Sequence, residues 1–199
     1  EMQTTVKHIR DKSNNSRPLV GIVMTGSGPD KTYPFWDKVI SKLLNTTNAA
    51  IVLLGDGGIS KYIADAVEQT ITHVNRSTRL FNLCGKLKLR ESLTLVIQLD
   101  VVAGPETGLM NCAAYHKNQK VLLLSHSSHE NLSRDWINTA PLSFDGIPSH
   151  KLHKNWGDCE QDKASGAAVC MAGIAVEQVT DAIMAGMLSA CRPTLRTKG

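Results

Sequence analysis

Four runs of aliphatic residues, uninterrupted by polar alternation, constrain the fold of this chain more than any other feature. They lie at residues 19–26, 49–58, 99–104 and 120–126. Continuous apolar runs of this length are typical of strands that are buried on both faces of a parallel sheet. Between them, apolar residues recur at helical spacing. The helices predicted on this basis cover residues 34–45, 60–71, 87–98, 106–117 and 175–190.

Strands that alternate with helices in this way predict an α/β fold. We expect a Rossmann-like open parallel sheet with helices on both faces, because right-handed crossovers place helices on either side of the sheet. Residues 79–82 are predicted as a short additional strand. The length of 199 residues suits one domain, which we place at residues 18–199. The polar residues 1–17 are interpreted as a linker or a short lead-in helix.

Composition and charge narrow the class of protein. The net charge of +4 is modest and no block of five or six like charges occurs, which disfavours nucleic acid as a partner. No apolar run approaches the ~20 residues of a transmembrane helix and no signal-peptide pattern opens the chain, so we expect a soluble, cytoplasmic protein. The odd number of cysteines, five, disfavours a disulfide framework and fits a reducing compartment.

The loops that follow the predicted strands are where a ligand is expected, because open parallel sheets bind ligands beyond the carboxyl ends of their strands. The first loop, "TGSGPDKTYPFW", has hydroxyls at Thr25 and Ser27 and a mobile positive charge at Lys31. Glycines that allow close approach, with a lysine before a helix, suit a phosphate group. An ordinary Gly-Pro-Asp turn explains the same residues when this loop is taken alone.

The second loop, "LLGDGGIS", places Asp56 directly after a strand. An acidic side chain at this point often accepts hydrogen bonds from ribose hydroxyls. The alternative is a plain glycine turn in which Ser60 is the N-cap of the next helix.

The third loop lies within "VVAGPETGLMNCAA", residues 101–114. If the helix begins near Glu106, the backbone amides of Thr107, Gly108 and Leu109 point outward and can hold a pyrophosphate without a cationic side chain. Glu106 would then lie at the rim as an acceptor for sugar hydroxyls. A competing interpretation makes Pro105 the first helical residue and Glu106 a complement to the helix dipole, but leaves Thr107 and Gly108 unexplained.

The stretch "LCGKLKLRESLTLVIQLDVVAGPETGLMNCAAYHKNQKVLLL" resembles the nucleotide-sugar-binding half of glycosyltransferase family 9, the heptosyltransferases. The likeness extends upstream through "GIVMTGSGPDKTYPFW" and "VLLGDGG" and downstream to "AAVCMAGIAVEQVTDAI". It implies a role in lipopolysaccharide biosynthesis and a nucleotide-diphosphate-sugar donor, most simply ADP-linked. No metal or other cofactor is implied.

The resemblance also implies residue roles. The amides of Thr107, Gly108 and Leu109 would line the diphosphate, and Lys31 would neutralise its charge. Thr25 or Ser27 would bind a phosphate oxygen, and Asp56 would lie near the nucleoside. Glu106 would contact the donor sugar. Asn111 would also belong to the nucleotide-sugar site. Glu106 stands where the family more often has Asp, and Asn111 where many members have His, so the identity of the donor sugar stays open.

Length is a further departure from the family pattern. Members resemble two facing Rossmann-like domains in the GT-B arrangement, with the acceptor and the carboxylate base on the N-terminal one. The chain has room for only the C-terminal domain. The resemblance therefore implies a glycan or lipid-linked acceptor that binds through a missing N-terminal domain, and leaves the catalytic residues unknown.

His150, His153, Cys159 and Cys170 are compatible with a zinc site, but their spacing is not a standard ligand pattern, so ordinary loop packing is the favoured interpretation.

The leading function is the donor-binding domain of an inverting glycosyltransferase. A non-catalytic nucleotide-sugar-binding module is the alternative, and a sugar-nucleotide epimerase is disfavoured because it too needs a second domain.

Overall fold

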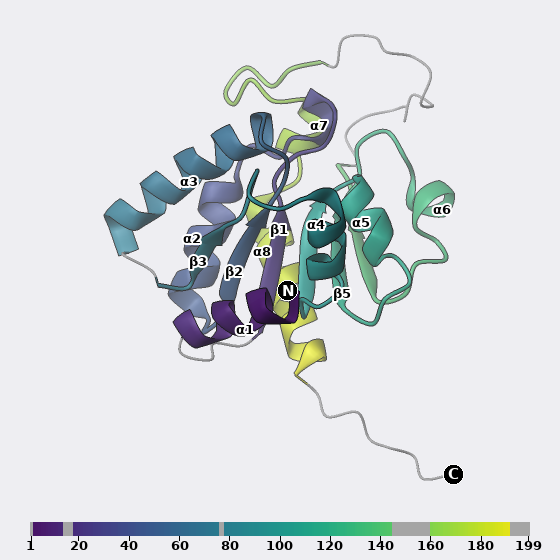
Figure 1. Cartoon of the computed structure of the whole chain (residues 1–199). Coiled ribbons are helices and arrows are strands. Elements are labelled where there is room, and N and C mark those ends of the chain that lie inside the picture. Colours follow the sequence, from purple (N-terminus) through teal and green to yellow (C-terminus); the bar gives the residue numbers. More distant parts are fainter. Residues whose placement is uncertain (1, 14–17, 76–77, 145–159, 192–199) are drawn as a thin grey trace, which may run out of the picture.

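A six-stranded, all-parallel sheet with the strand order β3-β2-β1-β4-β5-β6 forms the centre of the molecule (Figure 1). The computed structural model describes residues 2–13, 18–75, 78–144 and 160–191. The sheet confirms the predicted α/β fold class, and its order is that of dinucleotide-binding Rossmann folds. In chain order the elements are α1 (Met2–Lys12), β1 (Leu19–Val23), η1 (Pro29–Lys31), α2 (Trp36–Thr46), β2 (Ala50–Leu54), α3 (Ile59–Asn75), β3 (Leu80–Asn82), α4 (Leu89–Val96), β4 (Val101–Pro105), α5 (Gly108–Ala113), β5 (Gln119–Leu123), α6 (His129–Leu132), β6 (Thr139–Leu142), α7 (Val169–Ala172) and α8 (Val176–Ala190).

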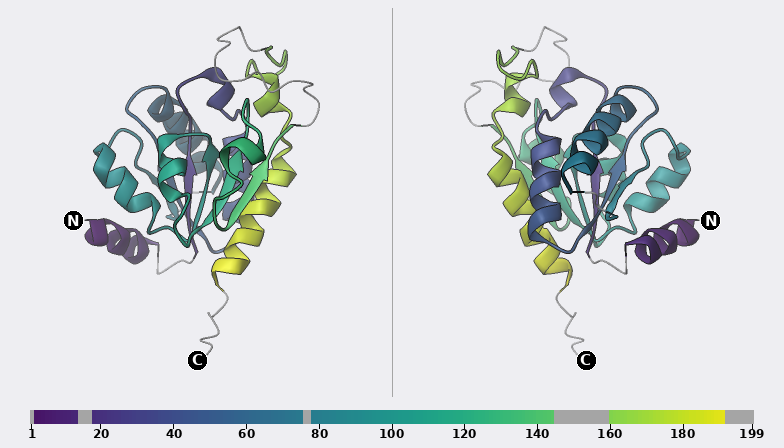
Figure 2. Two further views of the ribbon diagram at one scale, coloured as in Figure 1. Left: turned by 90° about the vertical axis from the view of Figure 1, so that its right-hand side faces the viewer. Right: turned by 90° about the vertical axis from the view of Figure 1, so that its left-hand side faces the viewer.

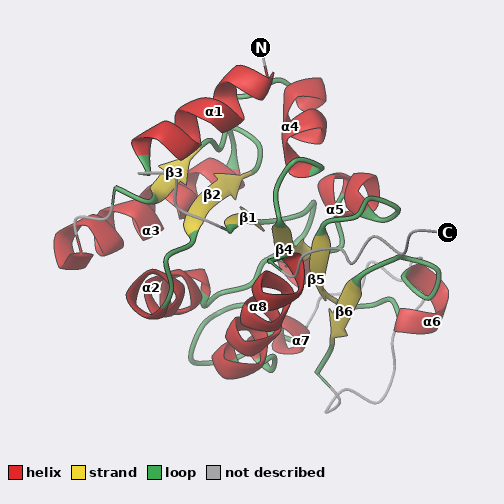
Figure 3. Ribbon diagram, turned by 90° about the horizontal axis from the view of Figure 1, so that it is seen from below, coloured by secondary structure: helices red, strands yellow, loops and turns green. Residues whose placement is uncertain are grey.

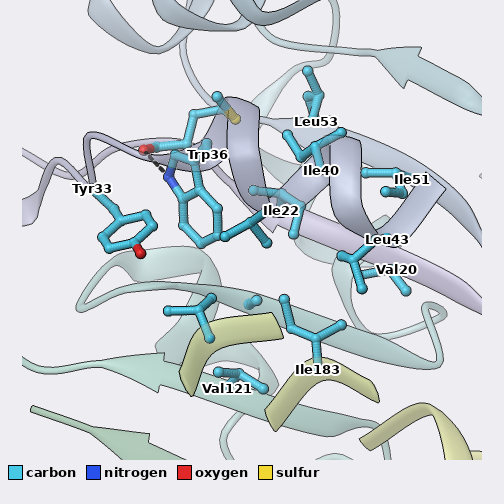
Figure 4. Close-up of a cluster of buried hydrophobic side chains, with 14 of the residues drawn as sticks. Val20, Ile22, Tyr33, Trp36, Ile40, Leu43, Ile51, Leu53, Val121 and Ile183 are labelled. Carbon is cyan, nitrogen blue, oxygen red and sulfur yellow. Dashed lines mark hydrogen bonds between the residues drawn. The ribbon is translucent and has the colours of Figure 1, made fainter. Parts of the chain in front are cut away.

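Helices cover both faces of the sheet, with α1, α4 and α5 on one side and α2 and α8 on the other (Figure 3). Successive residues of a strand point to opposite faces, so each strand supplies both layers of the core. In β1, Val20 and Ile22 pack with Ile183 of α8, whereas Leu19 and Val23 face α1 and α4. Figure 4 shows the α2 and α8 layer, and every residue of β1, β2 and β4 is buried.

The loop after β1 is fixed to the body of the protein by two aromatic side chains. The indole Nε1 of Trp36 donates to the carbonyl oxygen of Met24 at 3.0 Å, the dashed bond in Figure 4. The hydroxyl of Tyr33 donates to the carbonyl oxygen of Ile174 at 3.0 Å, and both rings are buried. These bonds hold both ends of a loop that the site requires. Figure 2 shows this loop at the opposite end of the molecule from α1.

Residues 2–12 form helix α1, the lead-in helix of the two alternatives, and its Val6 and Ile9 are buried in the same core layer as Leu19. Other elements differ from those predicted. The sixth strand, β6, was not predicted, because its four residues are only half-buried at the sheet edge and include a proline. Helix α5 begins at Gly108 and not near Glu106. None of the described helices is long and apolar enough to span a membrane.

Lys120 is a buried cation at the amino end of β5. Its side chain is 1% exposed, and Nζ donates at 2.7 Å to the carbonyl oxygens of His116 and Asn118. Burial disfavours the charged form and lowers the pKa of Lys120 from 10.5 to about 8. The folded chain therefore releases this proton at a lower pH than the unfolded chain does.

We expect Lys120→Met to change how stability depends on pH. Between pH 8 and 10 the unfolded wild type binds more protons than the folded wild type. The free energy of unfolding of the wild type should therefore rise with pH in this range, relative to that of the variant. The rise is at most about 1.4 kcal/mol per pH unit. Urea unfolding at several pH values measures it. The exposed Lys117→Met is the control, and a difference independent of pH would contradict the lowered pKa.

Candidate functional site

The loops after β1, β2, β3 and β4 surround a cleft of about 720 Å³ at the carboxyl edge of the sheet. β2 and β3 extend the sheet on one side of β1, whereas β4, β5 and β6 extend it on the other side. The topological switch point therefore lies between β1 and β4. Open α/β sheets bind ligands at this switch point. The structure brings together all the residues predicted as a site. Those lining the cleft are Thr25, Ser27, Lys31, Asp56, Glu106, Thr107, Gly108, Leu109 and Asn111.

Lys31 lies on the β1–α2 loop, in a turn that the backbone closes on itself. The amide of Gly26 donates to the carbonyl oxygen of Lys31 at 2.8 Å. The amide of Lys31 donates to the carbonyl oxygen of Gly28 at 2.9 Å. The alkyl chain of Lys31 lies over Gly26, where an added Cβ would be 2.7 Å from the Lys31 Cβ. Glycine at position 26 therefore leaves the room that this lysine occupies. Among the described residues that line the cleft, Lys31 is the single basic one, and none of the described carboxylates pairs with it.

The two hydroxyl residues of the same loop differ in their accessibility. Thr25 is 7% exposed, and its Oγ1 lies 2.6 Å from the Oγ of Ser60 at the start of α3. This bond ties the β1–α2 loop to α3. Ser27 is exposed at the cleft, so its hydroxyl is the more available of the two for a ligand.

Asp56 caps helix α3. Its Oδ1 accepts from the amides of Gly58 at 3.1 Å and Ser60 at 3.3 Å, while its other oxygen has no hydrogen-bond partner among the described residues. The alternative that made Ser60 the N-cap is wrong, because Ser60 is already the second residue of α3. A carboxylate with one oxygen committed to amides and one directed to solvent can still accept a hydroxyl group.

The β4–α5 turn exposes backbone amides to the cleft. Thr107 is the N-cap of α5, and its Oγ1 accepts from the amide of Met110 at 3.3 Å. The first amides of a helix have no carbonyl partner within it, which leaves those of Gly108 and Leu109 for an acceptor from outside the helix. An added Cβ at Gly108 would meet no atom within 4 Å, so this part of the turn borders open space.

Glu106 does not lie at the rim as expected. It is 6% exposed, and its Oε1 accepts from the amides of Ser125 at 3.1 Å and Ser127 at 3.3 Å. Its Oε2 accepts from the Ser127 hydroxyl at 3.0 Å. Both oxygens are therefore committed to the β5–α6 loop, and the carboxylate holds that loop against the β4–α5 turn.

One wall of the cleft is apolar, and the sequence did not predict it. Four leucines contribute to it, of which only Leu109 was predicted, and Leu89 is 72% exposed. Leu87 and Leu89 fall within the helix predicted at residues 87–98, and no sequence pattern marks Leu132 as part of a ligand surface. The lining residues not predicted include Gly55, Gly57, Ser60, Gly85, Leu87, Leu89, Ser92 and Leu132.

The described residues hold no candidate metal site. They contain no group of three or more His, Cys, Asp and Glu side chains that could hold a metal ion. His150, His153 and Cys159 lie outside the described residues, whereas Cys170 is buried in the core. Of the histidines after β5, His126 lies 3.2 Å from the carboxylate of Asp30.

Known proteins resemble this chain both in sequence family and in fold. Residues 1–140 match the model of glycosyltransferase family 9 (heptosyltransferase). The chain is similar in fold to the ADP-heptose lipopolysaccharide heptosyltransferase II of E. coli, with a TM-score of 0.70, 16% identity, and coverage of 92% of this chain and 51% of that chain. It is also similar to a family 9 glycosyl transferase of Veillonella parvula, with a TM-score of 0.65, 14% identity, and coverage of 94% and 52%. No curated protein matches the sequence.

These findings define the class of the protein. The parallel sheet matches the α/β fold of GT-B glycosyltransferases, and the chain spans about half the length of the solved structures it resembles. Since the family model matches more than half of its residues, the chain belongs to glycosyltransferase family 9. The resemblance found in the sequence is thereby confirmed.

Asp56→Ala should destabilise the fold through loss of the α3 cap, by about 1 kcal/mol. Asp56→Asn should cost much less, because its side-chain oxygen can still accept from the amides of Gly58 and Ser60. Urea unfolding of the three proteins checks the order. Equal losses in the two variants would show that Asp56 does not act as a cap.

Proposed function

We propose that this chain is the donor-binding half of an inverting glycosyltransferase and that its cleft holds a nucleoside-diphosphate sugar. Membership of glycosyltransferase family 9 and the position of the cleft at the β1/β4 switch point support this proposal. The observation that carries it is the open space over Gly108.

No contact or backbone angle among the described residues requires glycine at position 108. Its φ is not among the positive values found in the described residues, which belong to Gly85, Gly166 and Asn138, and no atom lies within 4 Å of an added Cβ. Glycine is also less favourable than alanine within a helix by up to about 1 kcal/mol. A ligand that approaches the backbone closely gives a physical reason for the missing side chain.

The polar groups of the cleft suit a diphosphate. The amides of Gly108 and Leu109 can donate to phosphate oxygens, and the ammonium of Lys31 supplies positive charge from the opposite loop. The exposed hydroxyl of Ser27 adds a further donor. Two elements that lie apart in the sequence thus supply complementary groups to one anion.

The rest of the cleft suits the nucleoside. The solvent-directed oxygen of Asp56 is an acceptor for ribose hydroxyls, while Leu87, Leu89 and Leu132 offer an apolar surface for a base. We propose ADP as the nucleotide to test first, because the similar E. coli protein is described as an ADP-heptose transferase. Asn111 is exposed at the same cleft and is a candidate contact for the sugar.

The proposed role in transfer follows from where charge develops. As the bond between the sugar C1 and the diphosphate breaks, the diphosphate leaves with negative charge. The fixed amides of Gly108 and Leu109 and the ammonium of Lys31 would stabilise that charge. The acceptor and the catalytic base are proposed to come from a second domain, since the chain spans about half of each similar structure.

A non-catalytic nucleotide-sugar-binding module is the second candidate. It is favoured by Glu106, whose carboxylate is committed to the β5–α6 loop and is not free for a sugar. A sugar-transfer assay on a protein that contains both halves separates the two candidates. Turnover would support the enzyme, and binding without turnover would support the module.

Gly108→Ala should weaken nucleotide binding without harming the fold. The added methyl group enters the space proposed for the diphosphate, so we expect the affinity for ADP, measured by calorimetry, to fall about tenfold or more. The free energy of unfolding should stay the same or rise by up to about 1 kcal/mol. Gly58→Ala is the control, because this glycine lies directly before the first residue of α3, also at the start of a helix, but does not line the cleft. Unchanged ADP affinity in Gly108→Ala would refute this placement of the site.

Lys31→Ala should weaken binding of the diphosphate more than it alters the choice of sugar. Loss of one charge-assisted hydrogen bond predicts a fall of about ten- to a hundredfold in affinity for both ADP and ADP-sugars. Calorimetry with UDP, ADP, UDP-sugars and ADP-sugars measures both the affinity for the diphosphate and the preference among sugars. Lys38→Ala removes an exposed lysine outside the cleft and should have no effect. Failure of the wild-type chain to bind any of these nucleotides would reject both candidate functions.

A further inference from the structure

The β5–α6 loop, residues 125–127, is bound by carboxylates from two other loops. Glu106 at the end of β4 accepts three hydrogen bonds from Ser125 and Ser127. Asp30, from the β1–α2 loop, accepts from the Ser125 hydroxyl at 3.3 Å through its Oδ2, which also lies 3.2 Å from Nε2 of His126. β4 lies between β1 and β5 in the sheet. Asp30 therefore reaches over the end of β4 to a loop two strands away.

The bonds of Asp30 constrain Lys31, because the two residues share one turn. Both belong to η1 (Pro29–Lys31), and the turn is closed by the bonds between Gly26 and Lys31 and between Lys31 and Gly28. The side chain of Asp30 is only 15% exposed, so water competes weakly for its bonds. At the other face of the turn, the alkyl chain of Lys31 rests on Gly26 and borders the cleft.

We propose that Asp30 is a positioning residue that fixes the direction of the Lys31 ammonium. By binding Ser125 and His126, it holds η1 against the β5–α6 loop, so that Lys31 faces the amides of the β4–α5 turn. The functional part of this inference rests on the proposed function, in which Lys31 binds a diphosphate. Asp30 itself does not line the cleft.

A preformed turn has a direct consequence for affinity. A lysine side chain and its loop lose conformational freedom when they are ordered by a ligand, and that loss opposes binding. A turn that is already fixed by Asp30 reduces this cost. Loss of the Asp30 carboxylate should therefore act on nucleotide affinity through Lys31, without any contact between Asp30 and the nucleotide.

Amide hydrogen exchange on the chain without ligand tests the positioning directly. In Asp30→Ala we expect the exchange of the Gly26 and Lys31 amides to accelerate about tenfold, because the turn that they close loses its anchor. Asp30→Asn keeps an oxygen for Ser125 and should give a smaller acceleration. Asp100→Ala is the matched control, since its carboxylate accepts from the amide of Leu19 at the other end of the sheet. Unchanged exchange at Gly26 and Lys31 would overturn the proposal.

A double-mutant cycle tests the functional link. We expect Asp30→Ala to weaken ADP binding about tenfold in the wild-type background and to have no further effect in Lys31→Ala. Equal losses in both backgrounds would overturn the link, because Asp30 would then act independently of Lys31. If the wild type binds no nucleotide, the proposed function fails, while the exchange of Gly26 and Lys31 still decides whether Asp30 fixes the turn.

Discussion

A strand that is buried on both faces leaves no side chain along its length for a ligand. The strands β1, β2 and β4 are buried throughout, so every polar contact at the centre of this sheet has to be made beyond their ends. Parallel pairing then gathers the carboxyl ends at one edge, and the reversal between β1 and β4 separates their loops. The cleft with Lys31 on one side and Gly108 on the other follows from that constraint.

The same constraint explains how much of the molecule the sequence predicts. Continuous apolar runs identify β1, β2, β4 and β5, because burial on both faces demands such runs. Once the strands are located, the loops that follow them are known, and the predicted residues line one cleft for that reason. The edge strand β6 escapes this logic. It is half-buried, so its residues need not be apolar, and its sequence pattern is that of a loop.

Side-chain partners were less predictable than positions. Glu106 binds residues 19 and 21 positions further along the chain, and Thr25 binds Ser60, 35 positions away. The sequence shows that a carboxylate or a hydroxyl follows a strand, but the direction of that group depends on the course of a neighbouring loop. Residue type and position alone are compatible with a sugar contact, a loop anchor or a helix cap. In the structure, Glu106 is a loop anchor and Asp56 is a helix cap.

Three glycines at the ends of strands and starts of helices differ in the reason for the missing side chain. Gly104 is required by packing, since an added Cβ would lie 2.6 Å from the Cβ of Val23 on the neighbouring strand. Gly85 is required by its backbone, which has a φ of 70°. Gly108 has neither reason, although it lies in the same kind of strand-to-helix turn that makes glycine common. In the sequence these three residues look alike. Packing explains the first glycine and backbone conformation the second, but neither explains Gly108 among the described residues. Gly108 borders the same cleft as Lys31, and for this reason the proposed ligand is placed there.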